Sequence, residues 1–175
     1  DPGQEDTKAL LEAAAEQANE AISDHVKAHP ETEGMGTTLS TMLFNGADFG
    51  VCHVGDSRGY LLRDGKLKQI TKDDTYVQSL VDKGELDPGD VSSHPQKSLI
   101  LKAYTGRPVE ATLFTLDAKP GDRILLCSDG LSDPVTASTI ETALGQGSIE
   151  QAGSTLVDLA IRSGGPDNVC LLYTS

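Results

Sequence analysis

Three aspartates have the residue type and the setting to bind a metal ion. Asp56 and Asp129 each adjoin a glycine, Asp167 lies two residues after Gly165, and all three stand at the end of an apolar, β-like run. Mg²⁺ and Mn²⁺ take several oxygen ligands in octahedral geometry, and carboxylates at strand ends supply such ligands rigidly. The neighbouring glycines would leave room for the waters of a hydrated cation. Taken singly, each aspartate also fits the commoner role of a turn or cap residue. The repeated setting indicates a divalent-cation site, and the turn interpretation stays open at this point.

Two patterns that suggest a protein nucleophile fit their surroundings less well. Residues 55–59 (GDSRG) match the G-x-S-x-G motif of serine hydrolases, which requires a helix directly after the serine. The residues that follow have a hairpin pattern instead. Cys127 would need an arginine shortly after it to build the phosphate loop of a cysteine-based phosphatase, and residues 128–134 contain none. We therefore expect core packing for Cys127 and no serine or cysteine nucleophile.

The four histidines carry no clear catalytic pattern. His25 and His29 are four residues apart on a predicted helix, a spacing open to a metal pair. The interpretation we favour is charge complementation at the helix C-terminus. His53 lies within a predicted strand, and His94 lies in an irregular segment.

The elements before the irregular segment have clear patterns. Apolar residues recur at three-to-four spacing over residues 6–29, which predicts a long amphipathic helix. Residues 38–70 predict an antiparallel meander, because Asn45-Gly46 and Asp64-Gly65 are two-residue hairpin signals. Residues 73–84 predict a short helix capped by Asp73 or Asp74.

The second half predicts a flap followed by strands and helices. Residues 85–104 have no clean periodicity and contain Pro and Gly, and an irregular stretch of this length is typical of a functional loop or flap. The later predicted elements are strands at 111–117, 122–129 and 168–175, and helices opened by the capping boxes Ser138/Glu141 and Ser148/Gln151. The predicted fold class is α+β, in layers, within a single domain over residues 1–175.

Composition narrows the classes of protein. The chain of 175 residues carries a net charge of −13, which repels phosphate backbones and disfavours nucleic acid as a partner. No apolar run is long enough to span a bilayer, so we expect no membrane insertion of this chain. Cys52, Cys127 and Cys170 all lie in apolar runs without a CxxC pair, which predicts buried thiols and a cytoplasmic protein.

Four ordered motifs resemble one enzyme family. They are EGMGTTL, VGDSRGYLLRDGKLKQIT, LLCSDGLSD and GGPDNV, and together they extend from the first helix to the last strand. In this order they resemble the metal-dependent Ser/Thr protein phosphatases of the type 2C class, in the bacterial branch that reverses Ser/Thr kinase signalling.

The resemblance implies a fold, a site and a mechanism. The implied fold is an α-β-β-α sandwich of two antiparallel sheets flanked by helices. It implies that Asp129 and Asp167 bind the active-site metal pair, that Asp56 contributes to a third, weaker site, and that residues of about 75–104 form the flap beside the active site. The implied cofactors are Mn²⁺ or Mg²⁺, two or three ions in the complete site, which activate a water for attack on phosphoserine or phosphothreonine.

One departure from the family pattern limits the expected activity. The family begins with a strand carrying an arginine and then a DGxGG motif whose aspartate bridges the two metals, and neither appears in residues 1–175. No catalytic residue beyond the metal ligands is therefore identified. We expect the chain alone to be impaired, to self-associate through exposed sheet edges, or to repack.

Two alternatives to an active phosphatase remain open. One is a catalytically inactive metal-binding or regulatory module of the same fold, and the other is a structural protein that binds Ca²⁺ or Mg²⁺. For the phosphatase, the expected partners are phosphorylated proteins, including Ser/Thr kinases and their substrates.

Overall fold

A computed structural model describes residues 2–174, and side chains from Asp6 to Thr174. The chain divides into two compact units, each assembled from two separate stretches. The first unit comprises residues 1–55 and 73–118, and the second comprises residues 56–72 and 119–175. No helix among residues 2–174 combines the length and apolar character needed to cross a membrane.

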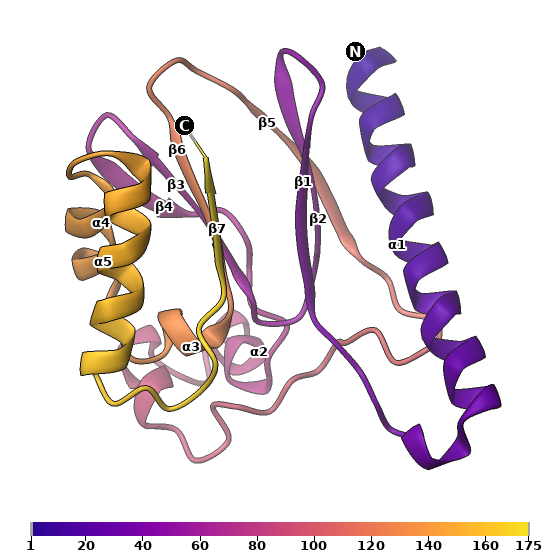
Figure 1. The fold of residues 1–175 in the computed structure, drawn as a ribbon. Coiled ribbons are helices and arrows are strands. Elements are labelled where there is room, and N and C mark those ends of the chain that lie inside the picture. Colours follow the sequence, from indigo (N-terminus) through magenta and orange to yellow (C-terminus); the bar gives the residue numbers. More distant parts are fainter. Residues whose placement is uncertain (1, 175) are drawn as a thin grey trace. The chain divides into compact units, whose positions relative to one another are not determined.

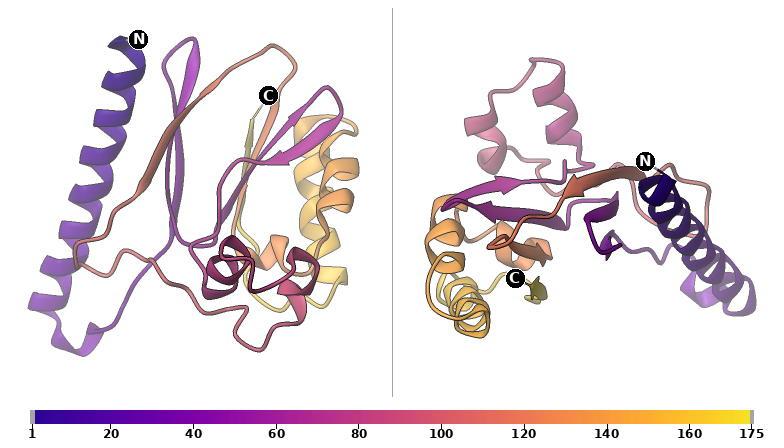
Figure 2. Two further views of the ribbon diagram at one scale, coloured as in Figure 1. Left: turned by 180° about the vertical axis from the view of Figure 1, so that it is seen from behind. Right: turned by 90° about the horizontal axis from the view of Figure 1, so that it is seen from above.

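The first unit is a three-stranded antiparallel sheet with a long helix packed on it. Its elements are α1 (Pro2–Ala28), η1 (Pro30–Thr32), β1 (Leu39–Phe44), β2 (Asp48–Val54), α2 (Tyr76–Asp82), η2 (Pro88–Ser93) and β5 (Thr112–Asp117). The strand order is β1-β2-β5, so β2 is central. Helix α1 runs alongside this sheet (Figure 2), and Gly50 lets it approach closely, because a Cβ there would overlap Thr7 and press on Leu11.

The second unit is a four-stranded antiparallel sheet with two helices against it. Its elements are β3 (Arg58–Arg63), β4 (Lys66–Gln69), β6 (Arg123–Cys127), α3 (Asp129–Ser132), α4 (Ala137–Leu144), α5 (Ile149–Arg162) and β7 (Leu171–Thr174). The strand order is β4-β3-β6-β7. Helices α4 and α5 lie side by side (Figure 1), and their apolar faces meet the sheet in one core that includes Leu125, Ile140 and Leu156.

The predicted meander over residues 38–70 is wrong as a single unit. Strands β1 and β2 form one hairpin and β3 and β4 form another, but the two hairpins belong to different sheets. Gly55 (φ +105°) lies between them in a conformation that favours glycine, and β2 pairs with β5 while β3 pairs with β6. The local hairpin signals were correct, and the strands' outer partners come from residues far along the chain.

The turn signals differ in detail. Asp64 (φ 52°) and Gly65 (φ 73°) form the predicted two-residue loop. The loop at Asn45 spans three residues between strands, because the Asn45 side chain accepts hydrogen bonds from the backbone N–H groups of Ala47 and Asp48. The hairpin was predicted correctly and its loop length was not.

Two of the predicted helix caps are wrong. Helix α2 is capped by Thr75, whereas Asp74 accepts a hydrogen bond from the Gly55 N–H. Helix α4 is capped by Thr136, two residues before the predicted Ser138. The capping box predicted for α5, between Ser148 and Gln151, is confirmed.

The cysteine prediction holds for two of three residues. Cys52 and Cys127 are buried, and burial raises the pKa of the Cys52 thiol. Cys170 is exposed, because it precedes β7, which is the last strand in its sheet's order. Strand β7 is also shorter than predicted, and Ser175, the predicted last residue of this strand, lies outside the described residues.

A buried ion pair joins the start of β6 to the end of β3. The Arg63 guanidinium donates two hydrogen bonds to the carboxylate of Asp122, at 2.8 and 2.7 Å, and the Lys119 N–H donates a third at 2.9 Å. The hydrogen bonds from Arg63 lower the pKa of Asp122 below its usual 3.8, in spite of burial. The ionised carboxylate is therefore the form that the fold stabilises.

We expect Asp122→Asn to lower the free energy of unfolding at pH 7 by about 2 kcal/mol, because the half-buried Arg63 loses its counter-charge. Since the folded-state pKa is depressed, the contribution of the carboxylate is complete above its usual pKa of 3.8 in the unfolded chain and is lost as pH falls through the folded pKa. Urea unfolding at pH 7 and near pH 3 measures both effects. Asp158→Asn, at an exposed position on α5, is the control and should change little. An equal loss at both pH values would contradict the assignment.

Candidate metal centre

The three predicted metal-binding aspartates all belong to the second unit and lie at one end of its sheet. Arg58 of β3 pairs with Cys127 of β6, and Cys127 pairs with Leu171 of β7. Asp56 comes two residues before Arg58, Asp129 two residues after Cys127, and Asp167 four residues before Leu171. Because neighbouring strands are antiparallel, these three positions come to the same end of the sheet.

Asp129 begins a single-turn helix. Strand β6 ends at Cys127, Ser128 occupies the N-cap position in extended conformation, and α3 starts at Asp129. A carboxylate in the first helical turn is favoured by the helix dipole, and the Asp129 side chain is half-buried. The sequence predicted the end of the strand here but not the helical turn, which fixes the backbone of Asp129 directly after the strand.

The loop that carries Asp167 is fastened to this turn by Ser128. The Ser128 backbone N–H donates to the Cys170 carbonyl at 3.0 Å. The Ser128 hydroxyl donates to the Asn168 carbonyl at 3.2 Å and accepts from the Cys170 N–H at 3.1 Å. One serine therefore holds two segments about 40 residues apart in sequence, and it is a site-building residue that sequence reasoning missed.

Gly130 allows the same two segments to approach. A Cβ at Gly130 would overlap the carbonyl oxygen and carbon of Asn168, so no larger residue fits without moving one backbone. The sequence interpretation gave glycines beside the aspartates the role of leaving room for a hydrated cation. The structure gives Gly130 a different role, which is close backbone packing against the Asp167 loop.

Asp167 itself is exposed. It follows Gly164 (φ +115°) and Gly165 (φ +51°), whose conformations turn the chain out of α5 and back toward β7. Its carboxylate accepts a hydrogen bond from the Asn168 N–H at 2.6 Å, which orients the side chain locally. The turn interpretation and the metal interpretation are thus compatible for this residue, because a carboxylate has further lone pairs.

The donor set fits an open site for a hard cation. Among the side chains described from Asp6 to Thr174, no group of three or more His, Cys, Asp or Glu is close enough to hold a metal ion unaided. The fold brings the segments of Asp129 and Asp167 together. Asp56, half-buried before β3, lies at the same end of the sheet but does not complete a three-ligand cluster. Mg²⁺ commonly takes one or two carboxylates and fills its other positions with water and phosphate oxygens. Asp129 and Asp167 match that pattern.

The structure also excludes the serine-hydrolase pattern at residues 55–59. Strand β3 begins at Arg58, directly after Ser57, so the motif lies in a strand-turn-strand context rather than at a nucleophile elbow. His53 is buried and shares a 2.8 Å hydrogen bond with Ser40 on the neighbouring strand. Its role there is consistent with sheet packing.

The remaining histidines lie in the first unit, away from the aspartates in sequence. The rings of His25 and His29 are 4.7 Å apart, both are exposed, and His29 lies 3.4 Å from the Glu31 carboxylate. His25 falls in the last turn of α1, in agreement with the predicted helix-end role. His94 makes an edge contact with the Tyr76 ring.

Comparison with known proteins identifies close relatives. The family described as "Protein phosphatase 2C" matches residues 1–154. The serine/threonine protein phosphatase PstP of Mycobacterium tuberculosis is 54% identical over 167 residues, which cover 95% of this chain and 32% of PstP. The serine/threonine phosphatase stp of Listeria innocua is 31% identical over 170 residues, which cover 96% of this chain and 68% of that protein. The chain thus spans about a third of the length of the mycobacterial relative.

Solved structures give the same result and confirm the predicted fold class. The crystal structure of M. tuberculosis PstP/Ppp superposes with a TM-score of 0.94 at 54% identity, covering 96% of this chain and 72% of that chain. The catalytic domain of PstP in complex with two manganese ions superposes with a TM-score of 0.89 at 51% identity, covering 95% and 70%. The two antiparallel sheets with flanking helices are therefore an arrangement already known in these phosphatases.

Proposed function

Because the chain belongs to the protein phosphatase 2C family, we propose that the protein containing it hydrolyses phosphoserine and phosphothreonine in other proteins with Mn²⁺ or Mg²⁺. The observation that carries this proposal is the set of Ser128 hydrogen bonds to Asn168 and Cys170. These bonds hold the segments of Asp129 and Asp167 together at one end of the sheet. The manganese ions in the related PstP catalytic domain support the choice of metal.

We assign the metal-binding role to Asp129 and Asp167, with Asp56 contributing to a further, weaker site. When bound, the metal supplies a water of lowered pKa and neutralises charge on the phosphate. The chain's own part is to hold the carboxylates in place. Asp129 is fixed by the first turn of α3, and Asp167 is oriented by the Asn168 N–H. Ser128 and Gly130 fix the spacing of the two segments, which spares the site from reorganising when charge develops.

The second candidate is a catalytically inactive metal-binding or regulatory module of the same fold. It is favoured by one observation: the described side chains of residues 6–174 contain no three-ligand cluster. The two candidates differ in turnover but share metal binding at Asp129 and Asp167. Phosphatase activity in the intact protein therefore separates them, and metal binding tests the site that both require.

We expect metal removal to abolish hydrolysis. With the intact protein that contains this chain, EDTA should reduce hydrolysis of a phosphothreonine peptide to background, and Mn²⁺ should restore it. The reason is that the cation both neutralises the charge of the phosphate and activates the water. Amide NMR should show Mn²⁺-induced broadening at residues 128–131 and 166–170. Activity that persists in EDTA would contradict metal dependence. Broadening confined to residues away from these two segments and from Asp56 would contradict the ligand assignment.

The flap of residues 75–104 has a defined base. The Tyr76 N–H donates to the Leu99 carbonyl at 2.9 Å, and the Leu101 N–H donates to the Asp74 carbonyl at 2.8 Å. These bonds close a loop that contains α2 and η2, which suits a segment that handles substrate while its ends stay fixed. We propose that residues 1–175 belong to one catalytic domain, which includes this flap.

The cellular setting belongs to the same proposal. Phosphorylated proteins, including Ser/Thr kinases and their substrates, are the proposed partners in signalling. Cys52 and Cys127 are buried thiols and not disulfides, which supports a reducing, cytoplasmic location. We also propose self-association of this chain through exposed sheet edges, on the ground that apolar side chains on edge strands, such as Leu172 of β7, are largely exposed.

A further inference from the structure

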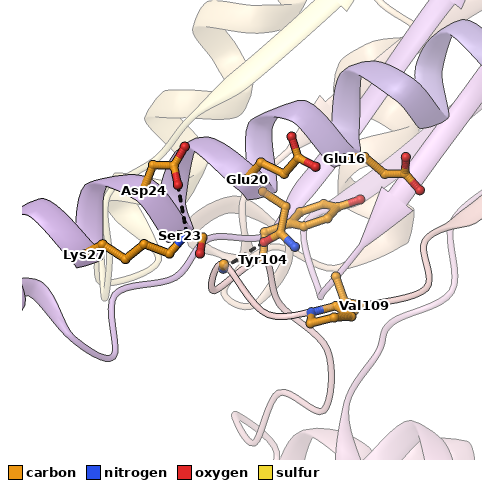
Figure 3. A pocket seen from close by; sticks show the side chains of 10 residues that line it. Glu16, Glu20, Ser23, Asp24, Lys27, Tyr104 and Val109 are labelled. Atoms are coloured by element: carbon orange, nitrogen blue, oxygen red, sulfur yellow. Dashed lines mark hydrogen bonds and ion pairs between the residues drawn. The ribbon is translucent and has the colours of Figure 1, made fainter.

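Two adjoining hollows lie along α1 in the first unit. One has a volume of about 560 Å³ and the other about 340 Å³. They share the side chains of Glu16, Tyr104, Pro108 and Val109, so they form one groove between α1 and residues 104–111. Figure 3 shows the acidic side chains of α1 on one side, Val109 on the other, and the Tyr104 ring between them.

The α1 wall of this groove is a row of carboxylates. Glu12, Glu16, Glu20 and Asp24 follow one another at intervals of four residues, and all four line the groove. Carboxylates in this spacing repel one another and cost helix stability, so the helix gains nothing from the arrangement by itself. The basic residue among the lining side chains is Lys27, which lies 3.0 Å from the Asp24 carboxylate.

The opposite wall is apolar, with one further acid. Pro108, Val109 and Ala111 form it, and Glu110 stands on its edge. Tyr104 is 4% exposed at the floor. Burial, followed by the Cys52 thiol, raises the pKa of Tyr104 to about 12, and the carboxylates of Glu16 and Glu12 add to the rise. The negative field of the wall therefore reaches the floor.

The groove is held open by specific contacts. The Asn19 side chain donates to the Arg107 carbonyl and accepts from the Gly106 N–H, each at 2.8 Å. A Cβ at Gly106 would lie 2.7 Å from the Ser23 backbone, so glycine permits this close contact. The loop is thus clamped to α1 at one end, and the groove needs little reorganisation to accept a ligand.

The charges suit an extended chain better than a single ion. Residues four apart on a helix are about 6 Å apart along its axis. Alternate residues of an extended chain are about 6.6 Å apart and point to one side, while the others point to the opposite side. A segment with basic and apolar residues in alternation therefore meets both walls at once. From Glu12 to Lys27 the wall is about 22 Å long, which matches about seven extended residues.

We propose that this groove binds an extended segment of a partner protein in which arginine or lysine alternates with apolar residues. The basic side chains pair with the carboxylate row, and the apolar side chains pack on Pro108 and Val109. The groove lies wholly in the first unit, whereas the proposed metal ligands lie in the second. Binding therefore does not depend on the proposed phosphatase activity, and failure of either proposal leaves the other standing.

Fluorescence anisotropy with the labelled peptide Arg-Val-Arg-Val-Arg-Val-Arg tests the proposal on the intact protein. We expect saturable binding that Glu16→Gln combined with Glu20→Gln weakens at least about fivefold, since each exposed ion pair contributes modestly. Both side chains are exposed and glutamine is a good helix former, so the variant should fold normally. The matched control, Glu33→Gln with Glu85→Gln, makes the same charge change at exposed sites outside the groove and should alter affinity less than about twofold.

A second peptide separates the groove from general attraction to an acidic protein. Arg-Arg-Arg-Arg-Val-Val-Val has the same composition without the alternation, and we expect it to bind more weakly. Equal affinity for the two peptides, equal loss in the control variant, or no saturable binding would each overturn the proposal. Chemical-shift changes centred on Gly106 and residues 12–27 are the expected NMR result, and changes confined to other residues would also overturn it.

Discussion

Replacing Asp129 with asparagine should lower Mn²⁺-dependent phosphatase turnover of the intact protein by at least about 100-fold. The amide keeps the size of the side chain but removes the charge that holds the cation, and changes in the ligand sphere of a catalytic metal cost at least one to two orders of magnitude. The first turn of α3 tolerates asparagine, so the fold should persist. The turnover of a phosphothreonine peptide and the Mn²⁺ affinity measured by calorimetry should fall together.

Asp64→Asn is the matched control for this variant. It makes the same carboxylate-to-amide change in the same unit, at a loop position with φ 52° that asparagine adopts readily. Its turnover should stay within about twofold of the parent, because substitutions in surface turns away from a site have small effects on the protein. If Asp129→Asn kept full Mn²⁺ affinity and turnover, the assignment of Asp129 as a ligand would be wrong.

Gly130→Ala should damage both stability and metal binding although it alters no charged group. The added methyl overlaps the Asn168 carbonyl, and the obstacle is backbone, which cannot rotate away as a side chain would. Forced repacking of this kind costs about 3 kcal/mol in the free energy of unfolding. The Asp167 loop must shift, so Mn²⁺ affinity should fall about 10-fold to 100-fold. Urea unfolding and calorimetry measure the two effects.

Gly145→Ala provides the comparison. Gly145 has φ −80°, a conformation open to alanine, and an added methyl group would lie 3.2 Å from its nearest neighbour, the Glu141 carbonyl oxygen. We expect a change below about 1 kcal/mol and unaltered Mn²⁺ affinity. Were Gly130→Ala to resemble Gly145→Ala, the close approach of the two segments would not matter for the site.

The sequence predicted local structure where one stretch of chain determines it. The Asp64-Gly65 loop, the α5 capping box and the long first helix all depend on residues within a few positions of one another. The prediction of N-cap residues was wrong where several suitable residues lie next to or near one another. Thr75 was preferred to Asp74 because the Asp74 carboxylate is engaged by the Gly55 N–H, a contact 19 residues away that local pattern does not contain.

The sequence predicted where the proposed ligands lie along the chain but not how the fold brings their segments together. Asp129 and Asp167 were identified from their motifs, and both lie at the same end of the second unit's sheet. The junction between them depends on the β6–β7 register and on Ser128, whose three hydrogen bonds reach residues 40 and 42 positions later. Gly130 was noticed for the wrong reason, because its neighbour in space is Asn168 and not a residue close in sequence.

The pairing of β3 with β6 has a consequence for the order of folding during synthesis. Arg58 pairs with Cys127, which is made 69 residues later, since 127 − 58 = 69. At about 5–20 residues per second, the ribosome needs roughly 3–14 seconds to supply that partner. During this interval the β3–β4 hairpin has its turn but neither its neighbouring strand nor helices α4 and α5, and Tyr60 and Leu62, which end up in the core, have nothing to pack on. The nascent hairpin is therefore the segment of this unit in which a chaperone would find exposed apolar side chains.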